Sequence, residues 1–188
     1  VQAQAPIGGT KETSFLHTYN GGGHLILGVT PVGGTRAAYL GLFGYNDGTL
    51  RGIALACSRE DRKLSVQAEN SAVYAGALVG WNAGSVYNCA VSGYELSGHA
   101  YNGNILYLGA LAGYNSGSIR ASGASSPLID GTVTFAQLYA GGFAGANSGQ
   151  IRQCYVMGNL QFTDVRDSGV TLGGFTTENT GSLRDSYC

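Results

Sequence analysis

The chain has 188 residues, a formal net charge of −1, 32 glycines and 11% charged residues. That length suits one domain, and the glycine content disfavours helices, because glycine destabilises a helix interior by about 1 kcal/mol relative to alanine. The charge balance gives no electrostatic case for a nucleic-acid partner, and no apolar run approaches the roughly 18 residues of a spanning helix, so we expect no membrane insertion.

Residues 1–37 precede the regular part of the chain and are predicted to form an N-terminal strand or cap region. The segment begins at Val1 without an initiator Met, which fits a processed N-terminus. The stretch 18–23, Thr-Tyr-Asn-Gly-Gly-Gly, is a faint copy of the motif that follows. We therefore expect a single repeat domain over 1–188, with this cap region followed by five repeats over 38–188.

The repeats share one motif, in which an Asn is followed two residues later by Gly. The five segments are 42–48, 78–84, 111–117, 143–149 and 175–181, and their motif asparagines are Asn46, Asn82, Asn115, Asn147 and Asn179. Successive motif asparagines are 36, 33, 32 and 32 residues apart. A period that settles at one value indicates a repeat architecture.

Counted from the motif Asn as position zero, the residues four before and four after it are apolar in every repeat and are predicted to face the core. The Asn-x-Gly element is predicted to be a tight corner, because both residue types tolerate positive φ. Positions seven and nine alternate inward, a pattern typical of a half-buried strand. A third strand is predicted with inward pairs Leu64/Val66, Val133/Phe135 and Leu160/Phe162.

Three short strands per repeat cannot bury an apolar face alone, whereas stacked repeats share one core. The predicted fold is an all-β parallel β-solenoid (β-helix) of about five coils of 32–36 residues. A β-prism or a propeller-like array of antiparallel hairpins is the alternative. In a solenoid, equivalent residues lie about 4.8 Å apart, so the five motif asparagines would form an amide ladder that needs no ligand to explain it.

The string G-[GA]-[LF]-x-G-x-N-x-G, as in 76–84, resembles the GLUG motif of bacterial surface and secreted proteins. The resemblance covers Tyr39 to Val156 well and the fifth repeat in part, because Thr177 and Glu178 replace the usual glycine and aromatic residue. It implies an exported, adhesin-like protein at the cell surface. GLUG repeats also accompany the catalytic domain of IgA peptidases, but this chain has no H-E-x-x-H motif, so peptidase chemistry does not carry over.

From this resemblance we expect an extracellular module for adhesion or ligand display, which binds a glycan or a protein of a host or neighbouring cell. A structural stalk, or a subunit that stacks end to end into a filament, is the alternative. An accessory domain of a secreted peptidase is the third reading.

Two sets of outward residues are candidate ligand contacts. The aromatic set lies just before the corner and comprises Tyr45, Trp81 and Tyr114, with a second tyrosine set at Tyr74, Tyr107 and Tyr139. The cationic set occupies position five and comprises Arg51, Arg120, Arg152 and Arg184, with Tyr87 in the remaining repeat. Exposed rings suit sugars or a protein partner, and an arginine stripe suits an acidic glycan. The structural alternatives are a stabilising aromatic ladder and arginines paired with acids such as Asp185.

The four cysteines share inward parity, which predicts disulfides between neighbouring coils, Cys57 with Cys89 and Cys154 with Cys188. Buried free thiols are the alternative. No C-x-x-C pair is present, so we expect no metal site and no cofactor. The acidic residues sit at different phases of the repeat and do not cluster as acid–base catalysis requires, so we expect no enzyme activity.

Overall fold

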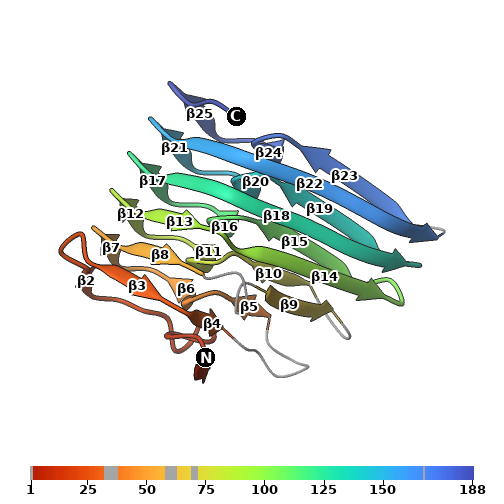
Figure 1. The fold of residues 1–188 in the computed structure, drawn as a ribbon, viewed down its shortest axis with the longest axis horizontal. Helices are drawn as coiled ribbons and strands as arrows, with labels where there is room; N and C mark the ends of the chain where they lie inside the picture. Colours follow the sequence, from red (N-terminus) through yellow and green to blue (C-terminus); the bar gives the residue numbers. More distant parts are fainter. Residues whose placement is uncertain (1, 32–37, 58–62, 69–71, 167) are drawn as a thin grey trace.

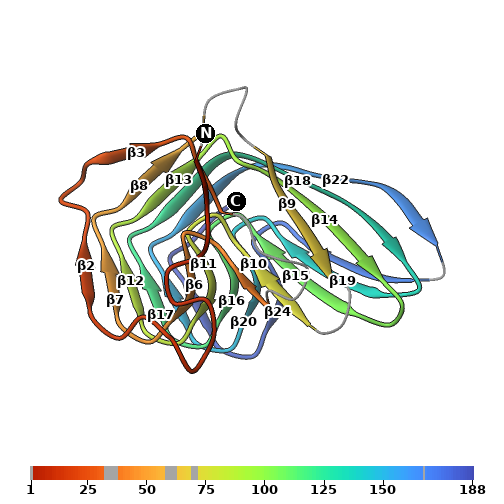
Figure 2. The same ribbon diagram turned by 90° about the horizontal axis from the view of Figure 1, so that it is seen from below.

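The computed structural model describes residues 2–31, 38–57, 63–68, 72–166 and 168–188. Every regular element within these ranges is a β-strand. The strands stack coil upon coil, with the N-terminus at one end of the stack and the C-terminus at the other (Figure 1). Seen from below, the coils lie behind one another as nested loops (Figure 2).

All pairings between the described strands are parallel. The predicted all-β parallel solenoid of about five coils is therefore confirmed. The alternative architectures built from antiparallel hairpins are wrong, because no hairpin pairing is present among the described strands.

Each coil contributes strands to four stacked sheets, which we name after their position or their side chains. The return sheet contains β5 (Tyr39–Leu40), β10 (Val73–Ala75), β15 (Ile105–Gly109), β19 (Gln137–Gly141) and β23 (Gly169–Gly173). The asparagine sheet contains β6 (Phe43–Asn46), β11 (Val79–Asn82), β16 (Ala112–Asn115), β20 (Ala144–Asn147) and β24 (Thr176–Asn179). The arginine sheet contains β2 (Thr18–Asn20), β7 (Thr49–Arg51), β12 (Ser85–Tyr87), β17 (Ser118–Arg120), β21 (Gln150–Arg152) and β25 (Ser182–Arg184).

The fourth is the long sheet, which also reaches the far tip of the coils. It contains β3 (Leu25–Leu27), β8 (Ala54–Ala56), β13 (Ala90–Ser92), β14 (Glu95–Tyr101), β9 (Lys63–Ala68), β18 (Gly123–Thr134) and β22 (Tyr155–Arg166). In the later coils the two short strands merge, so that β18 pairs with both β13 and β14. A separate two-stranded sheet pairs β1 (Gln2–Gln4) with β4 (Val29–Pro31).

The core follows the predicted phases of the repeat. The residues four before the corner and those at positions seven and nine are buried in every coil where the sequence analysis assigned them. Position four is fully buried in the first four coils, and Leu183 in the last coil is partly buried. Among the described side chains one predicted core residue is wrong, and the side chain of the predicted core residue Phe162 lies outside the described residues. Phe135 is 59% exposed, because it has a left-handed backbone (φ 50°) at the turn after β18 and points out of the sheet.

The glycines of the corner are required for a different reason than predicted. Gly48, Gly84, Gly117, Gly149 and Gly181 do not have positive φ. A Cβ on Gly117 would instead overlap the carbonyl oxygen of Gly84 in the coil before it, and a Cβ on Gly84 would overlap that of Gly48 in the same way. The corner therefore needs glycine because successive coils approach too closely there for any side chain.

The left-handed turn lies at position six, one residue after the arginine sheet ends. The five equivalent residues are Gly52 (φ 59°), Asn88 (51°), Ala121 (50°), Gln153 (56°) and Asp185 (53°). Glycine adopts this conformation most readily, Asn and Asp tolerate it, and Ala121 and Gln153 are held in it with strain. The turn redirects the chain from the arginine sheet into the long sheet in every coil.

The N-terminal segment forms part of an additional coil. Strand β2 pairs with β7 and β3 pairs with β8, so the faint copy of the motif at 18–23 extends two of the sheets by one strand. Ile7 and Phe15 also bridge to Phe43 and Asn46 in the first full coil. Residues 32–37, and the charged run 59–62 in the first repeat, lie outside the described residues.

Candidate binding face

The five motif asparagines stack into one amide ladder. Side-chain Nδ2 donates to Oδ1 of the next coil from Asn46 to Asn82 (2.7 Å), Asn82 to Asn115 (2.7 Å), Asn115 to Asn147 (2.7 Å) and Asn147 to Asn179 (2.6 Å). In the first four coils the same nitrogen also donates to the carbonyl oxygen of the corner glycine two residues on. The amides of the first four coils are thereby satisfied inside the fold, so these four asparagines are structural, whereas Asn179 is exposed at the end of the ladder.

The aromatic candidates form two adjoining columns. Tyr45, Trp81 and Tyr114 stack along the asparagine sheet, with ring centroids 5.9 and 4.1 Å apart. Along the return sheet a second column stacks Tyr39, Tyr74, Tyr107 and Tyr139 at 4.8–5.7 Å. Edge-on contacts such as Tyr74 to Trp81, at 4.8 Å, join the two columns.

This packing leaves little ring surface for a ligand. Each interior ring has both faces covered by the rings above and below it, and Tyr45 is buried while Trp81 and Tyr114 are half-buried. Sugars bind aromatic side chains through the ring face, so the interior rings Trp81, Tyr74 and Tyr107 do not form the exposed platforms predicted from the sequence. Ala146 and Glu178 end the first column, since they occupy the aromatic position in the last two coils.

Packing within the columns raises the pKa values of several tyrosine hydroxyls. Loss of solvent raises the pKa of Tyr107 to about 12, with smaller contributions from the facing Tyr74, from Glu178 and from the neighbouring phenols. Burial likewise raises the pKa of Tyr74, of Tyr39 and of Tyr45. These four hydroxyls therefore stay neutral at physiological pH.

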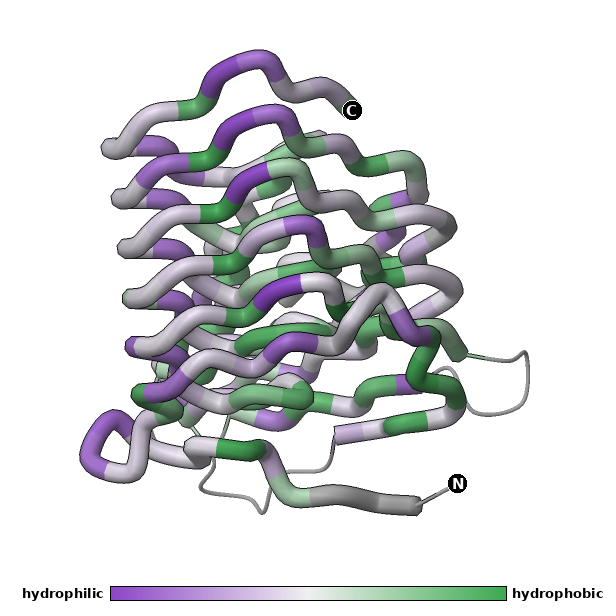
Figure 3. The backbone as a smooth tube through the Cα atoms, turned by 90° about the vertical axis from the view of Figure 1, so that its left-hand side faces the viewer, coloured by the Kyte–Doolittle hydropathy of each residue, from purple (hydrophilic) through white to green (hydrophobic). Residues whose placement is uncertain are grey.

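The predicted arginines form one exposed column on the arginine sheet. Register places Asn20 beside Arg51, Arg51 beside Tyr87, Tyr87 beside Arg120, Arg120 beside Arg152 and Arg152 beside Arg184. All four arginines are exposed, as is Tyr87 at 44%. Figure 3, which faces this side of the molecule, shows hydrophilic segments stacked coil above coil.

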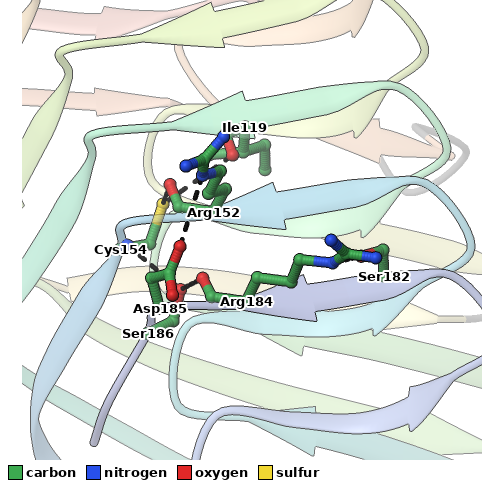
Figure 4. A network of polar contacts seen from close by, with 7 residues as sticks. All are labelled: Ile119, Arg152, Cys154, Ser182, Arg184, Asp185 and Ser186. Carbon is green, nitrogen blue, oxygen red and sulfur yellow. Dashed lines mark hydrogen bonds and ion pairs between the residues drawn. The ribbon is translucent and has the colours of Figure 1, made fainter.

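The four guanidinium groups differ in their partners. Nε of Arg152 lies 3.3 Å from Oδ2 of Asp185, the partner anticipated from the sequence, and both side chains are about three-fifths exposed, at 59% and 63% (Figure 4). Arg184 donates from Nε to Oγ of Ser182 at 3.2 Å (Figure 4). The guanidinium of Arg120 lies 4.8 Å from the ring centre of Tyr87. Among the described residues, Arg51 and Arg184 have no ion-pair partner.

A second column of small polar side chains runs beside the arginines, two residues earlier on each strand. It comprises Thr18, Thr49, Ser85, Ser118, Gln150 and Ser182, in register from β2 to β25. Alternation along a strand puts these residues on the same outward face as the arginine column, about 7 Å away. This column was not predicted from the sequence, although the polar residue that recurs at position three was its signal.

An open groove of about 580 Å³ follows this polar column across four coils. Its lining includes Ser85, Ser116, Ser118, Ser148, Gln150 and Ser182, together with the corner glycines of the same coils. The groove lining contains no charged residue. The arginine sheet thus presents a neutral polar groove beside a cationic column, and we call the two together the binding face.

The predicted disulfides are not formed, and all four cysteines are free thiols. The positions of the cysteines within their coils explain why the predicted pairs do not meet. Cys89 and Cys154 share the position-seven column with Ser122 and Ser186, and the backbone N–H of each cysteine donates to the serine hydroxyl of the next coil at 3.1 Å. Cys57 and Cys188 lie at other positions of the coil, four and two residues further along, so neither is opposite its predicted partner.

We also searched the described ranges for metal sites and for membrane-spanning helices. There, no group of three or more His, Cys, Asp or Glu side chains is arranged to hold a metal ion. In the same ranges, no helix has the length and apolar character needed to cross a membrane.

Comparison with known proteins returned no match to any family model, to any curated protein or to any solved structure.

Proposed function

We propose that this chain is a non-catalytic repeat module of a bacterial cell surface that binds an extended ligand, a glycan or a protein segment, along the binding face. The observation that carries the proposal is the groove, which runs without interruption across four coils beside outward side chains that recur in register. The resemblance to GLUG repeats supports the extracellular location and the adhesion role.

A ligand with its own repeat is the natural partner of such a surface. Equivalent positions recur about every 4.8 Å along the solenoid. Each full coil therefore offers a corner glycine and a polar residue at position three to the next unit of a linear chain, and every full coil except the one with Tyr87 adds an arginine. The core, the amide ladder and the aromatic columns are accounted for by folding. Recognition is therefore assigned to the exposed positions of the arginine sheet.

The test blocks the groove without touching the core. Ser118 lies midway along the groove and points outward, so Ser118→Trp should fill it. Ala90→Trp is the matched control, because Ala90 is exposed on the neighbouring long sheet. We expect the native chain and the Ala90 variant to bind members of a panel of immobilised polysaccharides and extracellular glycoproteins, and the Ser118 variant to bind none.

Absence of binding by the native chain to the whole panel would overturn the proposal. Equal binding by both tryptophan variants would also overturn it, provided that their unfolding temperatures match. Loss of binding in both variants would place the interaction elsewhere on the solenoid.

A structural stalk or end-to-end filament subunit is the second candidate. It is favoured by apolar surface in the last coil, where Leu172 and Tyr187 are exposed beside a cavity of about 430 Å³ lined in part by Ile129, Val156 and Leu160. Exposed apolar surface at a strand edge favours addition of further strands. Sedimentation over a concentration series should reveal growing assemblies that Leu172→Glu disperses, and a monomer at every concentration would exclude the filament.

A further inference from the structure

We infer that the ligand of the binding face is a linear acidic polysaccharide, which lies in the groove along the solenoid axis with its anionic groups against the arginine column. This inference rests on the proposed function and adds the chemical class of the ligand. It is argued from the charge of the face, the partners of its arginines and the chemistry of the groove.

The arginine column concentrates positive charge on one face of a chain whose net charge is slightly negative. The protein carries 10 Lys and Arg against 11 Asp and Glu, yet four of those ten cations lie in this single column. Arg120, Arg152 and Arg184 occupy three consecutive coils, and like charges on adjacent strands destabilise a sheet. Because a repeated array of this kind lowers the stability of the fold, its presence favours a role in binding an anion.

The column also keeps its hydrogen-bonding capacity. A guanidinium has five N–H donors, and the contacts of Arg152 and Arg184 with Asp185 and Ser182 each use only Nε. The terminal NH₂ groups of both residues have no partner within the part of the chain that the structure describes. A carboxylate or a sulfate group accepts two parallel hydrogen bonds from such a fork.

The groove contributes neutral polar groups that can hydrogen-bond to the sugar rings of such a polymer. Serine hydroxyls, the Gln150 amide and the glycine backbone line it, without charged groups. These groups match the hydroxyls of sugar rings. A neutral polar trough beside a cationic rim therefore fits a polymer whose rings are neutral and whose substituents are anionic.

Other polyanions fit less well. Single-stranded nucleic acids bind through free aromatic faces on which bases stack, whereas the ring faces here are covered within the two aromatic columns, and Tyr87 lies against Arg120. An anionic membrane surface is bound together with apolar side chains that enter the lipid. No apolar side chain points outward from β7, β12, β17, β21 or β25 apart from the ring of Tyr87.

The experiment compares polymers that differ only in charge. Polygalacturonate and its fully methyl-esterified form share one backbone, and dextran sulfate with dextran forms a second pair that separates sulfate from carboxylate recognition. We expect the native chain to bind at least one charged polymer and neither neutral counterpart. Affinity should fall as salt is added, because these exposed charges are screened over about 10 Å at 0.1 M ionic strength.

Three variants locate the charge requirement. Arg120→Gln with Arg184→Gln should lower affinity for the charged polymer about tenfold, roughly threefold for each exposed contact. Arg120→Lys keeps the charge but loses the planar fork, so it should weaken binding less than Arg120→Gln. Lys63→Gln removes a cation from the long sheet and should leave affinity unchanged.

The outcomes separate this inference from the proposed function. Equal binding of charged and neutral polymers, or native affinity in the double arginine variant, overturns the acidic ligand even if Ser118→Trp still abolishes binding. Tighter binding to a DNA duplex than to both charged polysaccharides overturns the polysaccharide. Failure of all four polymers overturns the inference, while the wider panel decides the proposed function separately.

Discussion

Asn82 and Asn115 are joined by a 2.7 Å hydrogen bond from Nδ2 of the first to Oδ1 of the second, and both side chains are completely buried. They lie 33 residues apart in the chain. This hydrogen bond therefore forms only when the two coils are stacked in register. It repeats through the stack, so each interior amide is at once a donor upward and an acceptor from below.

Replacing the central amide should remove bonds on both sides. Asn115→Ala removes the donor to the buried Oδ1 of Asn147 and one acceptor of the Asn82 Nδ2, which keeps its bond to the carbonyl oxygen of Gly84. A buried polar group left unsatisfied costs about 1–3 kcal/mol. We expect a loss of about 2–4 kcal/mol in the free energy of unfolding, measured by urea denaturation. Asn179→Ala is the control, because Asn179 is exposed at the end of the ladder, and it should lose about 1 kcal/mol. Equal losses would contradict a cooperative ladder.

The corner glycines should tolerate no side chain at all. In Gly117→Ala the new Cβ overlaps the backbone of Ala83 and Gly84, which cannot move without displacing the whole coil. We expect destabilisation of about 3 kcal/mol or more, seen as a lower unfolding temperature. Gly169→Ala meets only Cγ of Gln137, at 3.7 Å, and should stay near the native value. A stable Gly117 variant would show that the coils are not in van der Waals contact at this corner.

The tyrosine column predicts a loss of stability in alkali. The pKa of Tyr107 is about 12 in the fold and about 10 in an unfolded chain. Its contribution is fully present below pH of about 10 and is lost as the pH rises toward about 12, because the unfolded state releases the proton first. The urea midpoint should therefore fall over this range, and less steeply in Tyr107→Phe, which keeps the ring but has no proton to lose. Identical pH profiles for the two proteins would exclude Tyr107 as a contributor.

The cysteines should react in an order set by burial. Cys188 is exposed, whereas Cys89 and Cys154 are buried, at 2% and 1% exposure. Burial also raises the pKa of both buried thiols, and the thiolate is the reactive form. Alkylation followed by peptide mass analysis should label Cys188 first and the buried pair only on unfolding. A mass four hydrogens lower without reductant, two for each predicted disulfide, together with destabilisation by a reductant, would restore the disulfide hypothesis.

Much of the fold could be predicted from the sequence because the repeat is strict where side chains enter the core. Leu78, Val86 and Cys89 are assigned correctly since their phase recurs in every coil. The turn at position six was missed, because Asn88, Ala121 and Gln153 share a backbone conformation and no side-chain chemistry. Phe135 was misplaced because alternation alone cannot reveal where a strand ends.

The binding face was only partly predictable. The periodicity identified Arg51, Arg120, Arg152 and Arg184 as one stripe, and register places them so. Whether rings such as Trp81 have free faces depends on the spacing and tilt between neighbouring side chains, which a linear pattern does not contain. The groove was beyond prediction for a similar reason, since it is the space left by residues too small to fill it.

The close contact of the corner glycines has a consequence for how such a protein changes over generations. A residue inserted or deleted at a corner such as Gly84 or Gly117 would put a side chain where successive coils leave no room, so length changes at the corner are best accommodated as entire repeats. Successive repeats of 36, 33, 32 and 32 residues show that smaller length changes are accepted away from the corner. Gain or loss of a repeat thus lengthens or shortens the binding face by one coil and leaves the remaining coils unchanged.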